Sequence, residues 1–389
     1  ATQFYQQKDF KKSIEFADKL LKIDETQAEA YNLRGNAKYQ LEDFHGAIAD
    51  YSMAITINSK YAEAYKSRAT LYTKLKQYDK AIADMNRILE IEPGDGNAFY
   101  NRGVIHLELR EYDLALADIS KAITMNPNNP AYLQVRGGLL FQLNQIDLAM
   151  KDLDLALNKN PKLFEALKLR GAIYQRKNMP EKAIVDYTKA IAIDPKDANL
   201  YFNRGTAYAE AGDTTKAIAD FSSSITNQPA NEQAYLNRAI MFQSKGKNKE
   251  AIADYTKALS CNSMCSQALL NRGDLNYSSN SYDQALKDYT AALRIGEIDP
   301  ALYSKVGNCN FNMKKYDAAI EMYTKALQAN PRDAQTLYNR GKSKRALKQN
   351  AGAIDDYQSF LRLAEKDPEL KEFVPLVIKE IEYLKANSK

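Results

Sequence analysis

The stretch YFNRGTAYAEAGDTTKAIADF, residues 201–221, decides the fold. Tyr201, Gly205 and Tyr208 follow the spacing of one face of an amphipathic helix. A short break at Gly212 separates them from a second stretch with the same kind of spacing. The segment therefore predicts two short helices joined by a tight turn.

The same pair of patterns recurs every 34 residues from residue 28 to residue 367, without an interrupting linker. We number the 34 places of each copy from residue 28 onward, which gives ten full copies. Place 8 is Gly or Ala, and place 20 is Ala, in all ten copies. Small residues at both places allow two antiparallel helices to approach closely, and a proline at place 32 often ends the second helix.

These features resemble the tetratricopeptide repeat (TPR). The shared pattern is an aromatic residue at place 4, Gly or Ala at place 8, Ala at place 20, an aromatic residue at place 24 and Pro at place 32. The resemblance covers essentially the whole chain and is similar to the long superhelix of O-GlcNAc transferase-type arrays. It implies an all-α fold, a right-handed superhelical solenoid of antiparallel helix pairs.

The repeat register divides the chain into three segments. Residues 1–27 contain a partial N-terminal TPR whose first helix is cut short, so we expect that more chain precedes it in the native protein. Residues 28–367 contain ten full TPRs, and residues 368–389 depart from the pattern and predict a C-terminal capping helix and tail. The predicted apolar face of the capping helix consists of Phe373, Leu376, Val377, Ile381 and Leu384.

An arginine at place 7, Arg204 in the opening stretch, lies within an apolar stripe, where an unpaired ion would be costly. Nine of the ten repeats have Arg at place 7 and nine have Asp at place 23; the exceptions, Val306 and Met322, share one repeat. This covariation predicts an Arg–Asp ion pair within each repeat. The rival interpretation is a basic row for phosphate or nucleic acid, which a matching row of Asp would neutralise. We take as structural ion pairs Arg204–Asp220, Arg238–Asp254 and Arg272–Asp288.

Composition argues against several other functions. The net charge of +5 on 389 residues does not indicate nucleic acid as a partner, and no apolar window is long enough to span a bilayer. Three cysteines and two histidines, with no ligand spacing, predict no metal site, no cofactor and no catalytic residues. We therefore expect a protein without enzyme activity. The sparse, odd number of cysteines favours a reducing compartment such as the cytoplasm.

The first helix of each repeat has a second face, opposite the core, which in TPR arrays resembles the lining of a concave groove. Place 6 on this face is Asn in five repeats: Asn101, Asn203, Asn237, Asn271 and Asn339. An Asn amide offers both a donor and an acceptor, so such a row can bind the backbone of an extended peptide, and a similar row lines O-GlcNAc transferase-type arrays. The alternative is that these asparagines are simply solvated.

Place 5 adds apolar side chains next to this asparagine row: Tyr100, Phe202, Leu236, Leu270 and Tyr338. These could anchor a partner, or they could pack against neighbouring first helices. The predicted function is a protein-interaction scaffold or adaptor that binds an extended peptide or a partner protein in its groove. Two alternatives remain, a substrate-recruiting region of a larger enzyme and a structural component of a large assembly.

Overall fold

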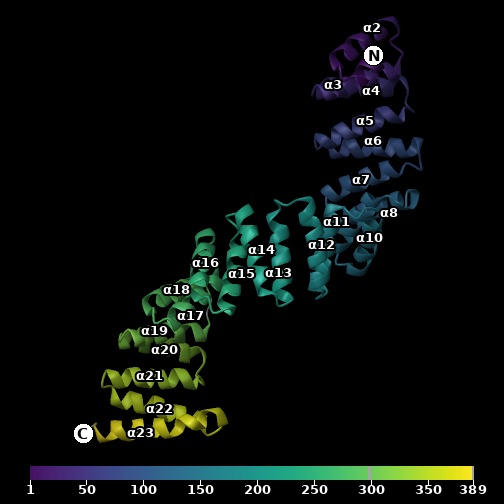
Figure 1. The fold of residues 1–389 in the computed structure, drawn as a ribbon. Coiled ribbons are helices and arrows are strands. Elements are labelled where there is room, and N and C mark those ends of the chain that lie inside the picture. The colour runs from purple at the N-terminus through teal and green to yellow at the C-terminus, as the bar shows by residue number, and fades with distance from the viewer. Residues whose placement is uncertain (297–298, 388–389) are drawn as a thin grey trace. The chain divides into compact units, whose positions relative to one another are not determined.

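The computed structural model describes residues 1–296 and 299–387, and within them the regular structure is helical throughout (Figure 1). The helices form two compact units, Ala1–Ile193 and Asp194–Lys389. In the first unit the helices are α1 (Thr2–Gln6), α2 (Phe10–Ile23), α3 (Ala28–Gln40), α4 (Phe44–Ile57), α5 (Ala62–Lys74), α6 (Tyr78–Ile91), α7 (Gly96–Glu108), α8 (Tyr112–Met125), α9 (Pro130–Gln142), α10 (Ile146–Lys159), α11 (Phe164–Arg176) and α12 (Pro180–Ile193).

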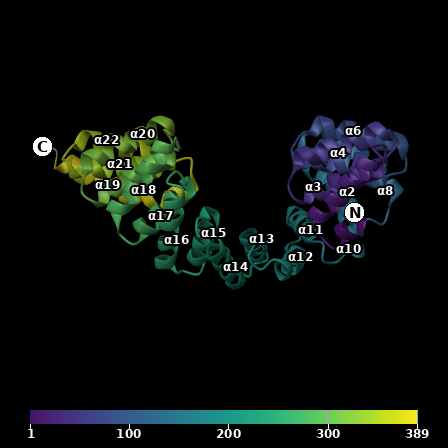
Figure 2. The ribbon, with the colours of Figure 1, turned by 90° about the horizontal axis from the view of Figure 1, so that it is seen from above.

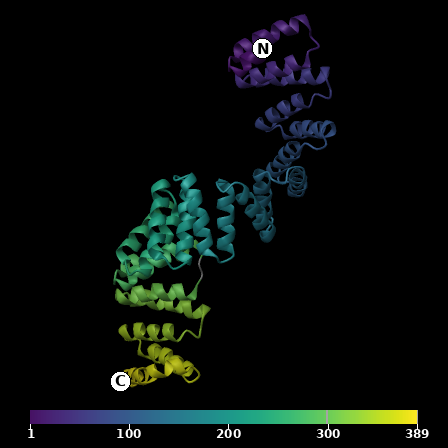
Figure 3. The same cartoon turned by 45° about the vertical axis from the view of Figure 1, so that its right-hand side comes forward.

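The second unit continues the same alternation of first and second helices. Its helices are α13 (Ala198–Glu210), α14 (Thr214–Asn227), α15 (Glu232–Ser244), α16 (Asn248–Cys261), α17 (Ser266–Ser278), α18 (Tyr282–Ile295), α19 (Pro300–Asn312), α20 (Tyr316–Ala329), α21 (Ala334–Ala346), α22 (Asn350–Ala364), a 3-10 helix (Pro368–Phe373) and α23 (Val374–Ala386). Within each unit, each helix packs on its neighbours along the chain, and the views of Figures 2 and 3 agree on this order. The all-α TPR solenoid with a C-terminal helix is therefore confirmed. The boundaries at residues 27 and 367 stay a prediction.

The turn between the two helices of a repeat depends on one residue with a left-handed backbone. Gly212, which breaks the pattern of the opening stretch, has φ +82°, and Gly246 has φ +70° in the next repeat. Asn144, Asn178 and Asn280 occupy the same place with φ between 56° and 62°. Asn tolerates this conformation better than most residues with a side chain. The turn therefore recurs even where the chain has no glycine.

The two helices of a repeat approach closely because place 8 has little or no side chain. A Cβ atom added to Gly205 would lie 2.9 Å from the ring of Phe221, and one added to Gly273 would lie 2.6 Å from the ring of Tyr289. The alanines at place 20, such as Ala217, are fully buried beside these rings. Seven repeats thus pack an aromatic ring at place 24 against a small residue at place 8, and Met85, Ile119 and Leu153 take the place of the ring in the other three.

An Arg–Asp fork, a bidentate pair of hydrogen bonds, joins the first helix of a repeat to the second helix of the same repeat. Arg Nε and one terminal nitrogen donate to the two carboxylate oxygens at 2.6–3.0 Å in every fork. The forks are Arg34–Asp50, Arg68–Asp84, Arg102–Asp118, Arg136–Asp152, Arg170–Asp186, Arg204–Asp220, Arg238–Asp254, Arg272–Asp288 and Arg340–Asp356.

The forks lie in the interior, where their loss would leave a charge without compensation. The nine aspartates are each at most 6 % exposed. The arginine side chains retain 16–25 % exposure at their outer edge. We propose that the forks are structural, because bidentate geometry satisfies both oxygens of a carboxylate that no water could reach freely.

The remaining terminal nitrogen of the guanidinium reaches the preceding repeat, a contact that the sequence analysis missed. Arg238 Nη1 donates to Ser222 Oγ at 2.9 Å, and Arg272 Nη1 donates to Thr256 Oγ1 at 2.8 Å. The acceptor always lies 16 residues before the arginine; the others are Asp18, Ser52, Asn86, Ser120, Asp154 and Thr324. A polar residue at place 25 of the preceding repeat accepts this hydrogen bond, and this residue could have been used to predict the contact from the sequence. One guanidinium therefore links three helices and two repeats.

The repeat at residues 300–333 replaces the fork by apolar contact. Val306 is 4 % exposed and belongs to a core cluster against which Met322 packs. Both changes remove an ion, so neither charge is left buried alone. This repeat shows that the fold accepts an apolar pair in place of the fork.

The C-terminal helix covers the end of the second unit (Figure 3). Its buried apolar face is narrower than the sequence predicts. Val377, Ile381 and Leu384 are buried, whereas Phe373 and Leu376 are 46 % and 47 % exposed, so their predicted place in the buried face is wrong. Phe373 ends a 3-10 helix, whose tighter turn does not share the phase of α23. Leu376 precedes Val377 by one residue and so lies about 100° around the helix from the buried stripe.

Tyrosines at place 24 of the second helices have buried rings, and their hydroxyl groups reach polar side chains of the first helices. Tyr255 is fully buried, and its Oη donates to Gln243 Oε1 at 2.8 Å. Burial raises the pKa of Tyr255 to about 12. The pKa values of Tyr51, Tyr289, Tyr323 and Tyr357 are also raised, first by burial. Burial in the second helices therefore favours the neutral form of these tyrosines.

The fork predicts a specific result in a double-mutant cycle. Arg238→Val alone strands Asp254, which is 6 % exposed, and should lower the free energy of unfolding by about 3 kcal/mol or more. Adding Asp254→Met should restore most of this loss, because the pair then matches Val306 and Met322. Urea unfolding followed by circular dichroism measures both values. An additive double mutant would contradict the fork as the cause of the loss.

The buried tyrosines predict a loss of stability at alkaline pH. A tyrosine whose folded-state pKa is raised stabilises the fold fully below the unfolded-state value of about 10. This stabilisation is lost as the pH rises through the folded-state value, about 12 for Tyr255. The urea midpoint should therefore fall between pH 10 and pH 12, and less steeply in Tyr255→Phe, since Phe221 already occupies this place in another repeat. A midpoint that stays constant to pH 12 would show that these tyrosines titrate normally.

Candidate partner-binding site

Four of the five predicted asparagines lie on first helices of the second unit. Asn203, Asn237 and Asn271 lie on α13, α15 and α17, and each is half-buried. Asn339 on α21 is also half-buried. In the intervening repeat, Lys305 of α19 occupies the same place. The second unit thus contains three consecutive members of the asparagine row.

Two of these asparagines are engaged by neighbouring side chains. Asn271 Nδ2 donates to Tyr255 Oη of the preceding repeat at 3.2 Å. Asn339 Nδ2 donates to Asn308 Oδ1 at 3.0 Å, and its Oδ1 accepts from Gln335 Nε2 at 3.1 Å. Lys305, at the same place, pairs with Asp274 at 2.7 Å. Place 6 therefore often ties one first helix to the preceding repeat.

Asn203 and Asn237 differ, because neither makes a hydrogen bond to the described residues. The reason is clear for Asn237. The residue corresponding to Tyr255 is Phe221 in the preceding repeat, and it has no hydroxyl group. The nearby Thr206 already donates its hydroxyl to the Phe202 carbonyl at 3.0 Å. The amides of Asn203 and Asn237 therefore remain available to a partner on two successive repeats.

The predicted apolar anchors beside this row are divided between core and surface. Leu236 is 4 % exposed within a core cluster of its repeat, so its predicted role as a partner contact is wrong. Place 5 turns inward there, because Leu236 fills space between successive helices. Leu270 is half-buried and packs against the adjoining core.

The aromatic residues at place 5 each show one face to the core and keep part of the ring exposed. Phe202 is half-buried, with its ring centroid 5.8 Å from that of Phe221. Tyr338 lies 5.8 Å from Tyr357 and 6.1 Å from Phe360 between ring centroids. These contacts hold Phe202 and Tyr338 in fixed positions beside the asparagine row.

The first unit contains the remaining two predicted residues of this kind. Asn101 on α7 is exposed, and the neighbouring Tyr100 is half-buried. The Tyr100 ring stacks on Tyr132 of the next repeat at 4.7 Å between centroids. Asn101 is therefore open to solvent, whereas Tyr100 serves partly as a contact between repeats.

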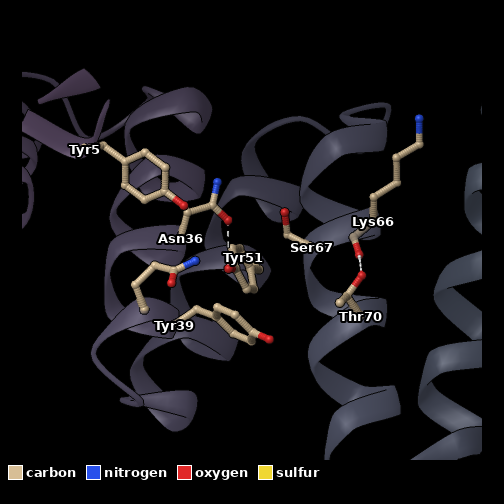
Figure 4. A pocket seen from close by; sticks show the side chains of 8 residues that line it. Tyr5, Asn36, Tyr39, Tyr51, Lys66, Ser67 and Thr70 are labelled. Atoms are coloured by element: carbon tan, nitrogen blue, oxygen red, sulfur yellow. Dashed lines mark hydrogen bonds between the residues drawn. The ribbon is translucent and has the colours of Figure 1, made fainter. Parts of the chain in front are cut away.

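The first unit also has a polar pocket of about 270 Å³ that the sequence analysis did not predict (Figure 4). Its lining is Tyr5, Asn36, Tyr39, Gln40, Tyr51, Lys66, Ser67 and Thr70. Tyr51 Oη donates to Asn36 Oδ1 at 2.8 Å, and Thr70 donates to the Lys66 carbonyl at 2.8 Å. The Lys66 ammonium pairs with Glu92 and Asp95. The pocket therefore offers hydroxyl and amide groups with little net charge.

The cysteine and histidine side chains do not assemble into a reactive site. His106 is buried and its Nδ1 lies 2.6 Å from Glu111 Oε2, while His45 is exposed. Cys309 is fully buried, and burial raises the pKa of its thiol to about 12, which disfavours the reactive thiolate. Among the described residues, no group of three His, Cys, Asp or Glu side chains could hold a metal ion.

A search for long apolar helices in residues 1–296 and 299–387 finds none able to cross a bilayer.

Family models described as tetratricopeptide repeat match residues 28–61, 62–95, 96–129, 198–231, 236–300 and 300–333, and one described as TPR repeat matches residues 181–212. No curated protein sequence matches the chain.

Similar solved structures include the C-terminal part of a TPR repeat-containing protein from Cytophaga hutchinsonii. It is 20% identical, with a TM-score of 0.52, over 61% of this chain and 98% of that one. A TPR protein from Parabacteroides merdae is 20% identical, with a TM-score of 0.45, over 64% of this chain and 98% of its own. YrrB, described as a TPR protein with an unusual peptide-binding site, is 25% identical, with a TM-score of 0.43, over 47% of this chain and 95% of its own. With the repeat matches and the helix pairs together, the chain belongs to the tetratricopeptide repeat family.

Proposed function

We propose that this protein is a scaffold that binds an extended peptide segment on the first helices of its second unit. The observation that carries this proposal is the pair of free amides at Asn203 and Asn237, 34 residues apart on successive repeats. Each amide can accept from a backbone N–H and donate to a carbonyl oxygen. Membership of the TPR family supports a role in protein–protein interaction in general.

The neighbouring side chains favour an uncharged contact. Phe202 and Leu270 are half-buried beside the amides. The Nδ2 of Asn271 donates to Tyr255, and its Oδ1 can still accept a hydrogen bond from a partner. The arginines that follow the three asparagines are paired in their forks, and Asp274 of α17 pairs with Lys305 of α19. Such a surface suits a peptide backbone with small or apolar side chains better than nucleic acid. Asn101, Tyr100, Tyr338 and Asn339 would contribute as secondary contacts.

Among residues 1–296 and 299–387 we find no arrangement suited to catalysis, and we propose a binding protein without enzyme activity. We also propose a cytoplasmic location, since Cys261, Cys265 and Cys309 are all free thiols. A substrate-recruiting region of a larger enzyme would use the same surface. A structural component of a large assembly would bind no short peptide.

The test uses peptides selected against the whole chain from a display library of unstructured sequences. Asn203→Ala with Asn237→Ala should weaken a selected peptide roughly tenfold or more, since each amide loses up to two hydrogen bonds. Fluorescence anisotropy with the labelled peptide measures the affinity. Circular dichroism should be unchanged, because neither amide has a partner within the described residues.

A matched control places the same change on second helices. Asn227→Ala with Asn248→Ala removes two exposed amides from α14 and α16 and should leave the affinity unaltered. Equal weakening by both double variants, or no effect of the first, would rule out the amide pair. Failure to select any peptide would favour the structural alternative.

A further inference from the structure

The second helices of the two units differ in the apolar surface that they expose. In the first unit, α8 and α10 expose Leu114, Leu148 and Leu155 by 52 %, 54 % and 42 %. In the second unit, α14, α16, α18, α20 and α22, which the structure describes in full, expose no large hydrophobic side chain. Exposed apolar side chains on second helices, which also include Phe16, Met53 and Val185, are therefore a feature of the first unit and not a property of the repeat.

Of these leucines, Leu148 and Leu155 line an apolar groove of about 480 Å³ between α8 and α10. Leu133 and Leu140 of α9, both buried, form its floor. Leu148 and Leu155 form one wall and lie two turns apart, about 10.5 Å along the helix axis. The opposite wall consists of Leu116, Ile123 and Pro127. Exposed apolar surface of this kind in a soluble domain marks an interaction site.

The polar groups in the groove cannot serve an extended backbone. Arg136 and Asp152 satisfy one another in their fork, and Arg136 Nη1 also donates to Ser120 at 3.3 Å. Gln145 and Lys151 remain as hydrogen-bonding groups in the lining. An extended segment would bury more N–H and C=O groups than these two can pair, whereas a helix satisfies its own backbone. The occupant must therefore be helical.

The charged residues that line the groove are Arg136, Asp152 and Lys151. Asp152 is held by Arg136, Asp147 by Lys177 at 2.5 Å, and Asp154 by Arg170 at 2.7 Å. Lys151, which lines the groove, makes no ion pair with the described residues. Glu111 and Asp113, at the start of α8, lie outside the lining; Glu111 contacts His106, and Asp113 lies in the first turn, where the helix dipole favours a negative charge. The rim therefore presents a cation to whatever binds the groove.

We propose that the groove between α8 and α10 binds an amphipathic helix of a partner protein, with leucine-type residues on one face and Asp or Glu beside them. The partner's apolar residues at positions i, i+3, i+4 and i+7 pack between the two walls, and its carboxylates meet Lys151. This surface is formed by α8, α9 and α10, and none of its residues belongs to the helices that carry Asn203 and Asn237.

The test uses two designed helical peptides that share one leucine face and differ only in flanking Glu or Lys. The Glu-flanked peptide should bind the whole chain more tightly in fluorescence anisotropy. Leu148→Gln with Leu155→Gln should weaken it by about tenfold or more, because both side chains are central to the groove. The matched control, Lys216→Gln with Ser223→Gln, changes the same two places of a repeat in the second unit and should have no effect.

A charge reversal tests the electrostatic part independently. Lys151→Glu should weaken the Glu-flanked peptide and strengthen the Lys-flanked one, without changing the fold at this exposed site. Equal affinity for both peptides, or binding that survives loss of the two leucines, would overturn the proposal. Self-association that disappears in Leu148→Gln with Leu155→Gln would also overturn it, because the groove would then bind a second copy of the chain. Binding to anionic lipid vesicles that disappears in the same variant would overturn it too, because the groove would then bind a membrane. Asn203→Ala with Asn237→Ala should leave helix binding intact, which separates this proposal from the proposed function.

Discussion

The buried Asp of each Arg–Asp fork constrains the rest of the structure. A carboxylate that is at most 6 % exposed must have partners, and the guanidinium of the same repeat supplies two donors in one plane. The third nitrogen of most of these arginines then reaches place 25 of the preceding repeat. Pairing within a repeat and stacking between repeats therefore share one side chain. Because the contact is directional, it favours one arrangement of neighbouring helices, which apolar packing alone would leave less defined.

The same packing decides which polar groups remain available on the first helices. A Tyr at place 24 brings a hydroxyl to the surface, where it binds a neighbouring amide, as Tyr255 binds Asn271. A Phe at that place, such as Phe221, leaves the amide of the next repeat, Asn237, without a partner. A substitution inside the core thus controls the chemistry of the outer surface. Asn203 is a different case, since the hydroxyl of Tyr187 in the preceding repeat donates to Gln175 instead.

Two surfaces of different chemistry follow from one repeated unit. First helices of the second unit present amides and half-buried rings, which suit an extended backbone. Second helices of the first unit present leucines beside an unpaired lysine, which suit a helix. Because each repeat contacts mainly its neighbours, such local changes do not disturb the remaining repeats. A TPR scaffold can therefore carry more than one binding site on a single chain.

The sequence by itself determined the helix pairs, their period of 34 residues and the partners of the forks, because the 34-place register repeats ten times and exposes the joint exception at Val306 and Met322. It also identified the asparagine row. Only the tertiary structure decided which members are free, since that depends on the side chains that lie beside each amide. It likewise moved Leu236 into the core, left Phe373 and Leu376 half-exposed and brought Leu148 and Leu155 together with α8 around one groove. Periodicity records which face of a helix a residue lies on, but contacts between repeats depend on side chains that are distant in the chain.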